Sequence, residues 1–93
     1  MVGILTLHLH IPGCSSLKEK RSRIKPLLAR LHRQFNVSTA EIDLQDKWHE
    51  TVLACGMVGN NNIHLEQSLQ SVLAWVKKYR MDMQVMDEKI ELI

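Results

Sequence analysis

Hydrophobic and polar residues alternate along the first stretch of the chain, from Val2 to Ile11. Leu5, Leu7 and Leu9 fall on one face of an extended chain, while polar side chains such as His8 fall on the other. The alternation predicts a β-strand with one well-buried side.

A helix is predicted to follow this strand. Pro12-Gly13 ends the strand, and Ser16 with Glu19 forms a capping box, in which two side chains satisfy the first free N–H groups of a helix. Pro26 lacks the backbone N–H that a helix interior uses, so it is expected to kink the helix. The helix is nevertheless expected to reach Phe35, because apolar residues continue to recur at helical spacing past Pro26.

Two further strands are predicted in the middle of the chain. Val37–Leu44 is expected to be an edge strand, because Glu41 and Asp43 interrupt its apolar pattern. Thr51–Val58 is apolar on both faces, which is typical of a central strand.

The last third of the chain predicts one more helix and one more strand. The run Gly59–Asn62 supplies turn and N-cap residues, and an apolar stripe then continues to near Tyr79. Met83–Ile93 suits a last strand that is interrupted around Asp87-Glu88.

The order strand, helix, strand, strand, helix, strand predicts the α+β ferredoxin-like βαββαβ fold over a single domain, residues 1–93. Right-handed crossovers then place both helices on one face of a four-stranded antiparallel sheet, with the first and third strands in the middle. Apolar stretches are too short for a membrane span, and no signal peptide is visible, so a cytoplasmic protein with no membrane partner is expected. Cys14 and Cys55 have no disulfide or zinc spacing and are expected to be reduced thiols.

Positive charge is concentrated in the first predicted helix. Residues 18–33 hold seven basic residues and one acidic residue, whereas the rest of the chain holds five basic and nine acidic residues. This asymmetry predicts a phosphate-binding surface of RNA-binding type, and an ordinary solvated helix face is the alternative. The candidate anion-binding residues are Ser16, Lys18, Lys20, Arg21, Arg23 and Lys25. The two central strands carry no aromatic residues for base stacking, so contact through phosphates is expected.

No set of residues predicts catalysis or a cofactor. His8 and His10 point to the same side of a strand, but they make only half of a metal site unless Cys14 or His64 comes near. Cys14 precedes a helix but has no histidine and acid spaced to activate it. We therefore expect a protein that is not an enzyme, with no catalytic residue, metal or cofactor.

A second candidate surface is the face of the sheet that the helices leave open. Ile4, Thr6 and Val52 belong to this face, which is expected to be smooth and apolar and therefore to form a homodimer or another protein interface. A shift of one residue in the third strand would instead exchange its two faces. Trp48 lies in a polar connection, where it either folds back onto the sheet or anchors a partner.

Several motifs resemble the YlxP-like family of small bacterial proteins, domain-of-unknown-function family 503. They are Ser16-Leu17-Lys18-Glu19-Lys20-Arg21, Phe35-Asn36-Val37-Ser38, Ala40-Glu41, Gln45-Asp46 and Trp48. The resemblance spans nearly the whole chain and implies a ferredoxin-like fold, but no established activity. Genes of that family often lie beside those for a translation initiation factor and a ribosome-binding factor, which implies a ribosome-linked role. Pro26 and Asn60–Asn62 are not part of the pattern.

Taken together, the sequence predicts a binding protein that uses its basic first helix to contact ribosomal RNA or a ribosomal subunit. The alternative is a homodimeric interaction or regulatory module that binds through its open sheet face.

Overall fold

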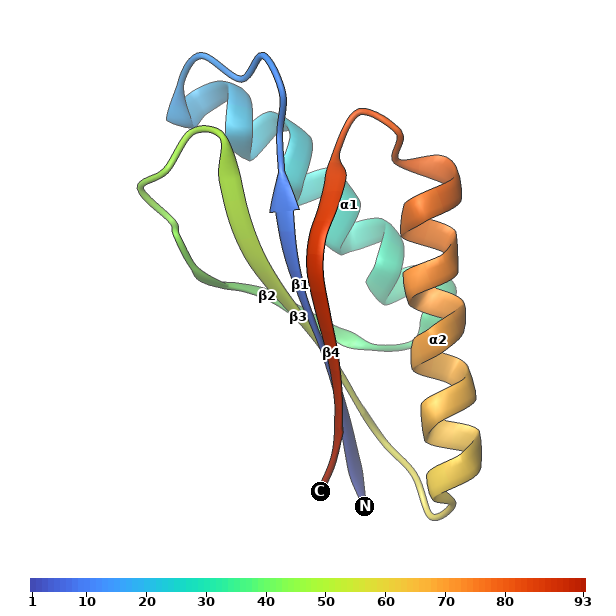
Figure 1. Ribbon diagram of the computed structural model, residues 1–93. Helices are drawn as coiled ribbons and strands as arrows, with labels where there is room; N and C mark the ends of the chain where they lie inside the picture. Colours follow the sequence, from blue (N-terminus) through green and yellow to red (C-terminus); the bar gives the residue numbers. More distant parts are fainter.

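Four antiparallel strands form one sheet in the order β2-β3-β1-β4, and two helices lie on one of its faces (Figure 1). The computed structural model describes residues 1–93. Its elements, in chain order, are β1 (Val2–His10), α1 (Leu17–Phe35), β2 (Ser38–Asp43), β3 (Glu50–Val58), α2 (Asn62–Tyr79) and β4 (Gln84–Leu92). This is the α+β ferredoxin-like arrangement expected from the sequence, with β1 and β3 in the middle and β2 at an edge.

The core lies between the sheet and the helices. Leu5, Leu7 and Leu9 of β1 and Leu53 and Cys55 of β3 are fully buried on the helix side of the sheet. The alternation expected for both central strands is therefore confirmed, and the one-residue shift considered for β3 is excluded.

The first helix is capped at both ends as its sequence suggests. The Ser16 hydroxyl accepts a hydrogen bond from the backbone N–H of Glu19 at 3.0 Å. Asn36 closes the other end in the left-handed conformation, with φ of 53°, and its N–H donates to His32 O. Between these caps α1 continues as one helix through Pro26.

Each edge strand contains one irregularity. In β2 the pairing with β3 passes over Ile42, and in β4 the pairing with β1 passes over Met86. A β-bulge of this kind leaves one residue unpaired and bends the strand. The predicted interruption of β4 is thus a bulge one residue before Asp87, within a strand that continues to Leu92.

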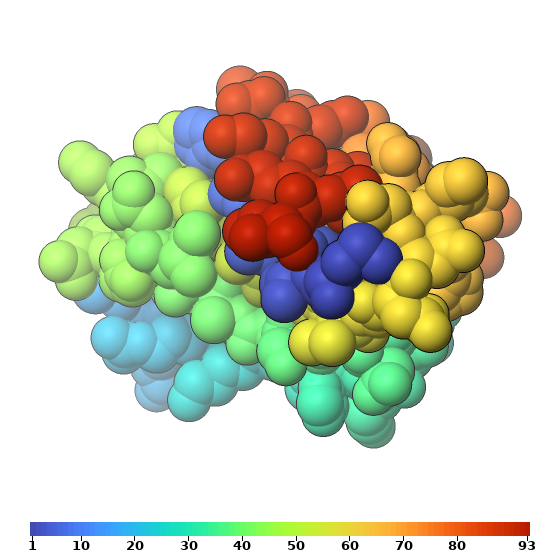
Figure 2. Space-filling view, turned by 90° about the horizontal axis from the view of Figure 1, so that it is seen from below, coloured from blue at the N-terminus to red at the C-terminus, as the bar shows by residue number.

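The molecule is elongated, measuring 42 × 23 × 22 Å. The N-terminus and the C-terminus of the chain lie side by side (Figure 2). Val2 N–H donates to Ile93 O at 2.9 Å, and Ile93 N–H donates to Val2 O at 2.8 Å. Neither α1 nor α2 combines the length and the apolar character that crossing a lipid bilayer requires.

Candidate nucleic-acid interface

The N-terminal turn of α1 is occupied by the protein's own side chains. Ser16 caps the helix through its hydroxyl, and the Glu19 carboxylate accepts the backbone N–H of Ser15 at 2.6 Å. This backbone hydrogen bond, helped by the Ser15 hydroxyl and by Arg23, lowers the pKa of Glu19. In the usual capping box this carboxylate accepts the N–H of the N-cap residue itself, whereas here it accepts the N–H of the residue before the N-cap. Ser16 acts as a helix cap, and the carboxylate beside it makes this turn less favourable for an external anion.

Lys20 is buried rather than exposed, which corrects the expectation that it presents its charge to a phosphate. Its side chain is 2% exposed, and its ammonium lies 2.8 Å from Glu41 Oε2. The same nitrogen donates to Leu44 O at 2.7 Å, and the Thr51 hydroxyl donates to the Glu41 carboxylate. No buried side-chain nitrogen or oxygen of this cluster lacks a hydrogen-bond partner, as a buried charge requires.

The Lys20 cluster fixes the connection between β2 and β3. Glu41 is the last regularly paired residue before the bulge at Ile42, and Leu44 then adopts a left-handed conformation with φ of 58°. A positive φ is unfavourable for a leucine. The Lys20 ammonium holds this turn by binding the carbonyl of Leu44. It thereby fixes the start of the connection that carries the Gln45-Asp46 motif.

Arg23 also makes its contacts inside the molecule. One of its terminal nitrogens lies 3.3 Å from Glu19 Oε1, and the other donates to Pro12 O at 3.2 Å. Three of the six predicted anion-binding residues, Ser16, Lys20 and Arg23, are therefore engaged in holding the helix start and its surroundings.

The other three predicted residues, Lys18, Arg21 and Lys25, are exposed and form no ion pair. Arg21 and Lys25 line a groove of about 420 Å³ between α1 and the start of the β2–β3 connection. The helix side of this groove also has three apolar residues, Leu17, Ile24 and Leu28. The opposite side has acidic and amide side chains, from Glu41, Gln45 and Asp46. The Lys20 side chain also borders this groove.

Two arginines outside the anion-binding set predicted from the sequence extend the basic surface of α1. Arg30 and Arg33 are exposed, and neither forms an ion pair with a carboxylate. Both lie on the C-terminal half of α1, so they continue its positive charge toward the end of the helix. Their position in the charged segment was visible in the sequence, but their neighbours on α2 were not.

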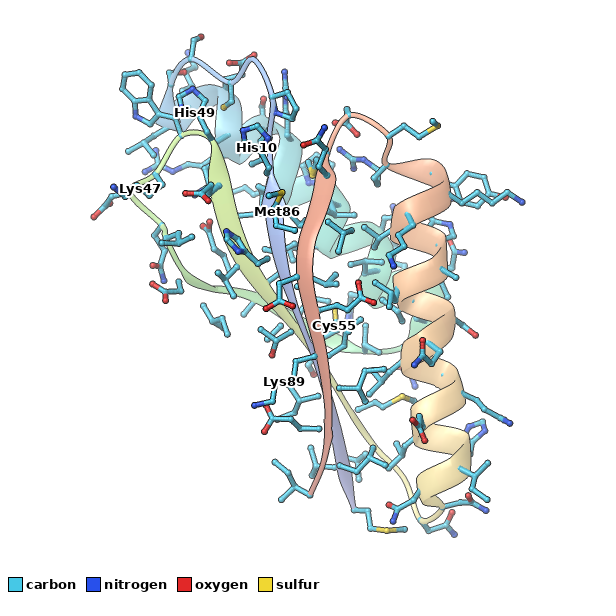
Figure 3. All side chains as sticks on the ribbon, viewed as in Figure 1. His10, Lys47, His49, Cys55, Met86 and Lys89 are labelled. Carbon is cyan, nitrogen blue, oxygen red and sulfur yellow. The ribbon has the colours of Figure 1, made fainter.

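The open face of the sheet is apolar over only half of its width, which corrects the expectation of a smooth apolar surface. Ile4, Thr6 and Val52 lie on this face and are half-buried, as expected. The adjacent β4 adds polar residues, because Lys89 pairs with Thr6 and Glu91 pairs with Ile4. Lys89 points away from α2 (Figure 3).

Trp48 lies in the β2–β3 connection with 48% of its surface exposed. Its ring contacts the neighbouring His49 ring, with centroids 6.4 Å apart, and does not enter the core. Trp48 therefore lies outside the core with about half of its surface covered, and which of its two expected roles it fills stays a prediction. Its exposure keeps it available as a contact residue for a partner.

The histidines and cysteines do not converge on one site. His8 lies 3.1 Å from Glu50, and His10 lies 3.4 Å from Gln84 near one end of the sheet (Figure 3). Cys14 is buried and its thiol donates to Ser16 O. Burial raises the pKa of Cys55 to about 11, so this thiol stays protonated near neutral pH. No three His, Cys, Asp or Glu side chains gather in an arrangement able to hold a metal ion.

Comparison with known proteins assigns the chain to a family. A family model described as "Protein of unknown function (DUF503)" matches residues 2–90. The chain is 37% identical over 79 residues to the "Uncharacterized protein YlxP" of Bacillus subtilis (strain 168), an alignment that covers 85% of this chain and 86% of that protein. The resemblance found in the sequence motifs is confirmed, and the chain belongs to the DUF503 family of proteins of unknown function.

Proposed function

We propose that this protein binds structured RNA through the phosphate backbone, with ribosomal RNA as its class of partner and without catalysing a reaction. The observation that carries the proposal is the set of cations on α1 that no carboxylate neutralises. They are Lys18, Arg21, Lys25, Arg30 and Arg33. A ribosomal partner is also the role that the family resemblance implies.

The distribution of charge favours one orientation of the protein on a polyanion. Five exposed cations without an ion pair lie on α1, whereas the rest of the chain holds more acidic than basic residues. A phosphate backbone is therefore attracted to α1 and repelled by the remaining surface. Phosphate contacts of this kind release counterions, so binding is expected to weaken steeply with added salt.

The test reverses the three exposed cations of the first half of α1 together, as Lys18→Glu, Arg21→Glu and Lys25→Glu. Binding to purified bacterial ribosomal subunits is measured by co-sedimentation, and binding to a stem-loop RNA by fluorescence anisotropy, between about 50 and 200 mM salt. Affinity falls as salt rises, so the slope of log affinity against log salt is negative. We expect this slope to become shallower by about 3, with roughly one unit for each lost phosphate contact. Lys20 is left unchanged because its ammonium is buried.

A matched control reverses the same number of charges elsewhere, as Lys47→Glu, Lys77→Glu and Lys89→Glu. These residues are exposed and lie outside α1. The control is expected to keep most of the salt-dependent binding. Equal affinity in the α1 variant and the wild type, or binding that does not respond to salt, would contradict the proposal.

A second candidate function, homodimerisation through the open sheet face, is supported by the apolar half of that face. Val58 is 80% exposed, and Gly56 and Ala54 continue the apolar strip along β3 to Val52. A contiguous apolar strip of this kind is typical of a protein–protein interface.

Dimerisation of this kind predicts that the wild type has the mass of two chains by light scattering, and that Val52→Glu has the mass of one folded chain. A carboxylate at this position would lose its hydration in the dimer, where its partner across the strands is His8, and would stay hydrated in the monomer. Lys89→Glu, on the charged half of the same face, is the control and is expected to remain dimeric. A wild type of single-chain mass, or an unchanged mass for Val52→Glu, excludes this candidate.

A further inference from the structure

A shallow depression of about 410 Å³ lies between the C-terminal half of α1 and the last turns of α2, which pack side by side on the sheet (Figure 1). It combines three arginines with two aromatic rings. Its lining residues are Pro26, Arg30, Arg33, Trp75, Tyr79 and Arg80. None of these belongs to the anion-binding set predicted from the sequence.

Three of the four aromatic residues of the chain gather at this place. The rings of Phe35 and Trp75 meet edge to face with centroids 6.1 Å apart, which holds Trp75 from the core side. The ring of Tyr79 lies 5.6 Å from that of Trp75 at an angle of 37°. Tyr79 is 59% exposed, so part of this aromatic pair faces solvent.

Two of the arginines around the rings retain free hydrogen-bond donors, and the Lys78 ammonium lies 5.2 Å from the centroid of the Tyr79 ring. The Arg30 guanidinium lies 5.8 Å from the Trp75 ring centroid, and only its Nε is engaged, as a donor to Gln34. Arg33 donates no hydrogen bond within the protein and forms no ion pair. Arg80 is instead held by two bonds to Asp82, each 3.1 Å long. Arg30 and Arg33 therefore have donors for a phosphate, while Arg80 is fixed in place.

The depression is continuous with the basic surface proposed to contact RNA. Lys25 and Arg33 are both exposed on α1 and lie eight residues apart, which is about 12 Å along a helix. A backbone that contacts Lys25 can thus follow the outer side of α1 to Arg33. There Arg33 lines the same depression as the Trp75 and Tyr79 rings of the neighbouring helix.

We propose that this depression receives one unpaired base of the bound RNA, which stacks on Tyr79 and the Arg30 guanidinium while Arg33 binds the adjacent phosphate. The inference rests on the proposed RNA binding and adds to it a preference for single-stranded segments. Stacking on an aromatic ring or a guanidinium plane is tolerant of base identity, because every base has a π-face. Ribosomal RNA offers such bases in its loops and bulges.

The test compares Tyr79→Ala with the wild type on three probes: a stem-loop RNA, the same stem-loop with abasic sites in the loop, and a blunt duplex. We expect Tyr79→Ala to lose about 5- to 100-fold in affinity for the intact stem-loop, as the removal of a stacking ring does elsewhere. Its affinity for the duplex and for the abasic stem-loop is expected to match that of the wild type. Tyr79→Phe keeps the ring and is expected to bind the stem-loop like the wild type.

A second readout follows the site itself. In a Trp48→Phe background the remaining tryptophan is Trp75, and its fluorescence is expected to change with the intact stem-loop but not with the abasic one.

Met81→Ala serves as the control substitution, because Met81 is 85% exposed and does not line the depression. Tyr79 is also exposed at the last position of α2, so its truncation leaves the core intact.

The outcomes separate the two proposals. If the wild type binds none of the three probes even at low salt, the RNA-binding proposal fails and this inference fails with it. The wild type can instead bind in a salt-dependent manner, with Tyr79→Ala and the wild type showing the same affinity for the intact stem-loop and for the abasic one. In that case only the inference about the unpaired base is overturned.

Discussion

Substitution of Lys20 by methionine is expected to lower the free energy of unfolding by about 3 to 5 kcal/mol, measured by equilibrium urea denaturation. The change leaves the Glu41 carboxylate, whose side chain is 22% exposed, without its cation, and it leaves Leu44 O without its donor. An uncompensated buried charge is far more costly than the loss of an exposed ion pair.

Replacement of both charged partners distinguishes this mechanism from a simple packing defect. The double variant Lys20→Met with Glu41→Leu contains no buried charge, so it is expected to recover most of the stability that Lys20→Met loses. Lys25→Met, on the exposed side of the same helix, is the control and is expected to change stability by less than about 0.5 kcal/mol. A double variant no more stable than Lys20→Met would show that the cost comes from packing or from the lost bond to Leu44 O, and not from the unpaired Glu41 carboxylate.

Truncation of Leu7 to alanine is expected to lower the free energy of unfolding by about 2 to 5 kcal/mol. Leu7 is fully buried in the middle of β1, where it pairs with Leu53 of β3 and faces the helices. The loss includes both the transfer of the removed methyl groups and the cavity they leave. A domain of this size has about 5 to 15 kcal/mol of total stability, so this variant is expected to unfold at a clearly lower urea concentration.

The neighbouring residue provides the control for this truncation. Thr6 lies on the opposite, open face of the same strand and is only half-buried. Thr6→Ala is expected to change stability by less than about 1 kcal/mol. Similar losses in the two variants would mean that the open face is covered to the same degree as the core, for example by a second chain.

Most of the fold could be predicted from the sequence because its elements have strong local periodicity. β1 alternates over its full length, and α1 combines a cap at Ser16 with an apolar stripe that outlasts Pro26. The least regular segment was β4, where polar residues replace the alternation. Its bulge at Met86 arises from pairing with β1, a partner more than seventy residues earlier in the chain.

The candidate site was less predictable, because residue type does not show which cations have internal partners. Lys20 stands in a basic run with Lys18 and Arg21 and looks equivalent to them. Its burial depends on Glu41 and Leu44, which reach it only because β2 bulges and its connection turns back toward α1. A carboxylate so far along the chain gives no local signal.

The aromatic depression was missed for a related reason. Trp75 and Tyr79 lie one turn apart on α2, a spacing that a core stripe also has. Arg30 and Arg33 also lie about one turn apart, on α1. The sequence shows the aromatic pair and the arginine pair separately. Only the packing of the two helices brings the two pairs together in one depression.

The two bulges have a consequence for how copies of this chain meet at high concentration. An edge strand exposes unpaired N–H and C=O groups, and long flat edges promote uncontrolled strand-to-strand aggregation. Here the β2 edge is short and bent at Ile42, and the β4 edge is bent at Met86 and carries Lys89. Both edges are therefore poor templates for another strand, and the chain is protected against growing into extended fibrils through its sheet.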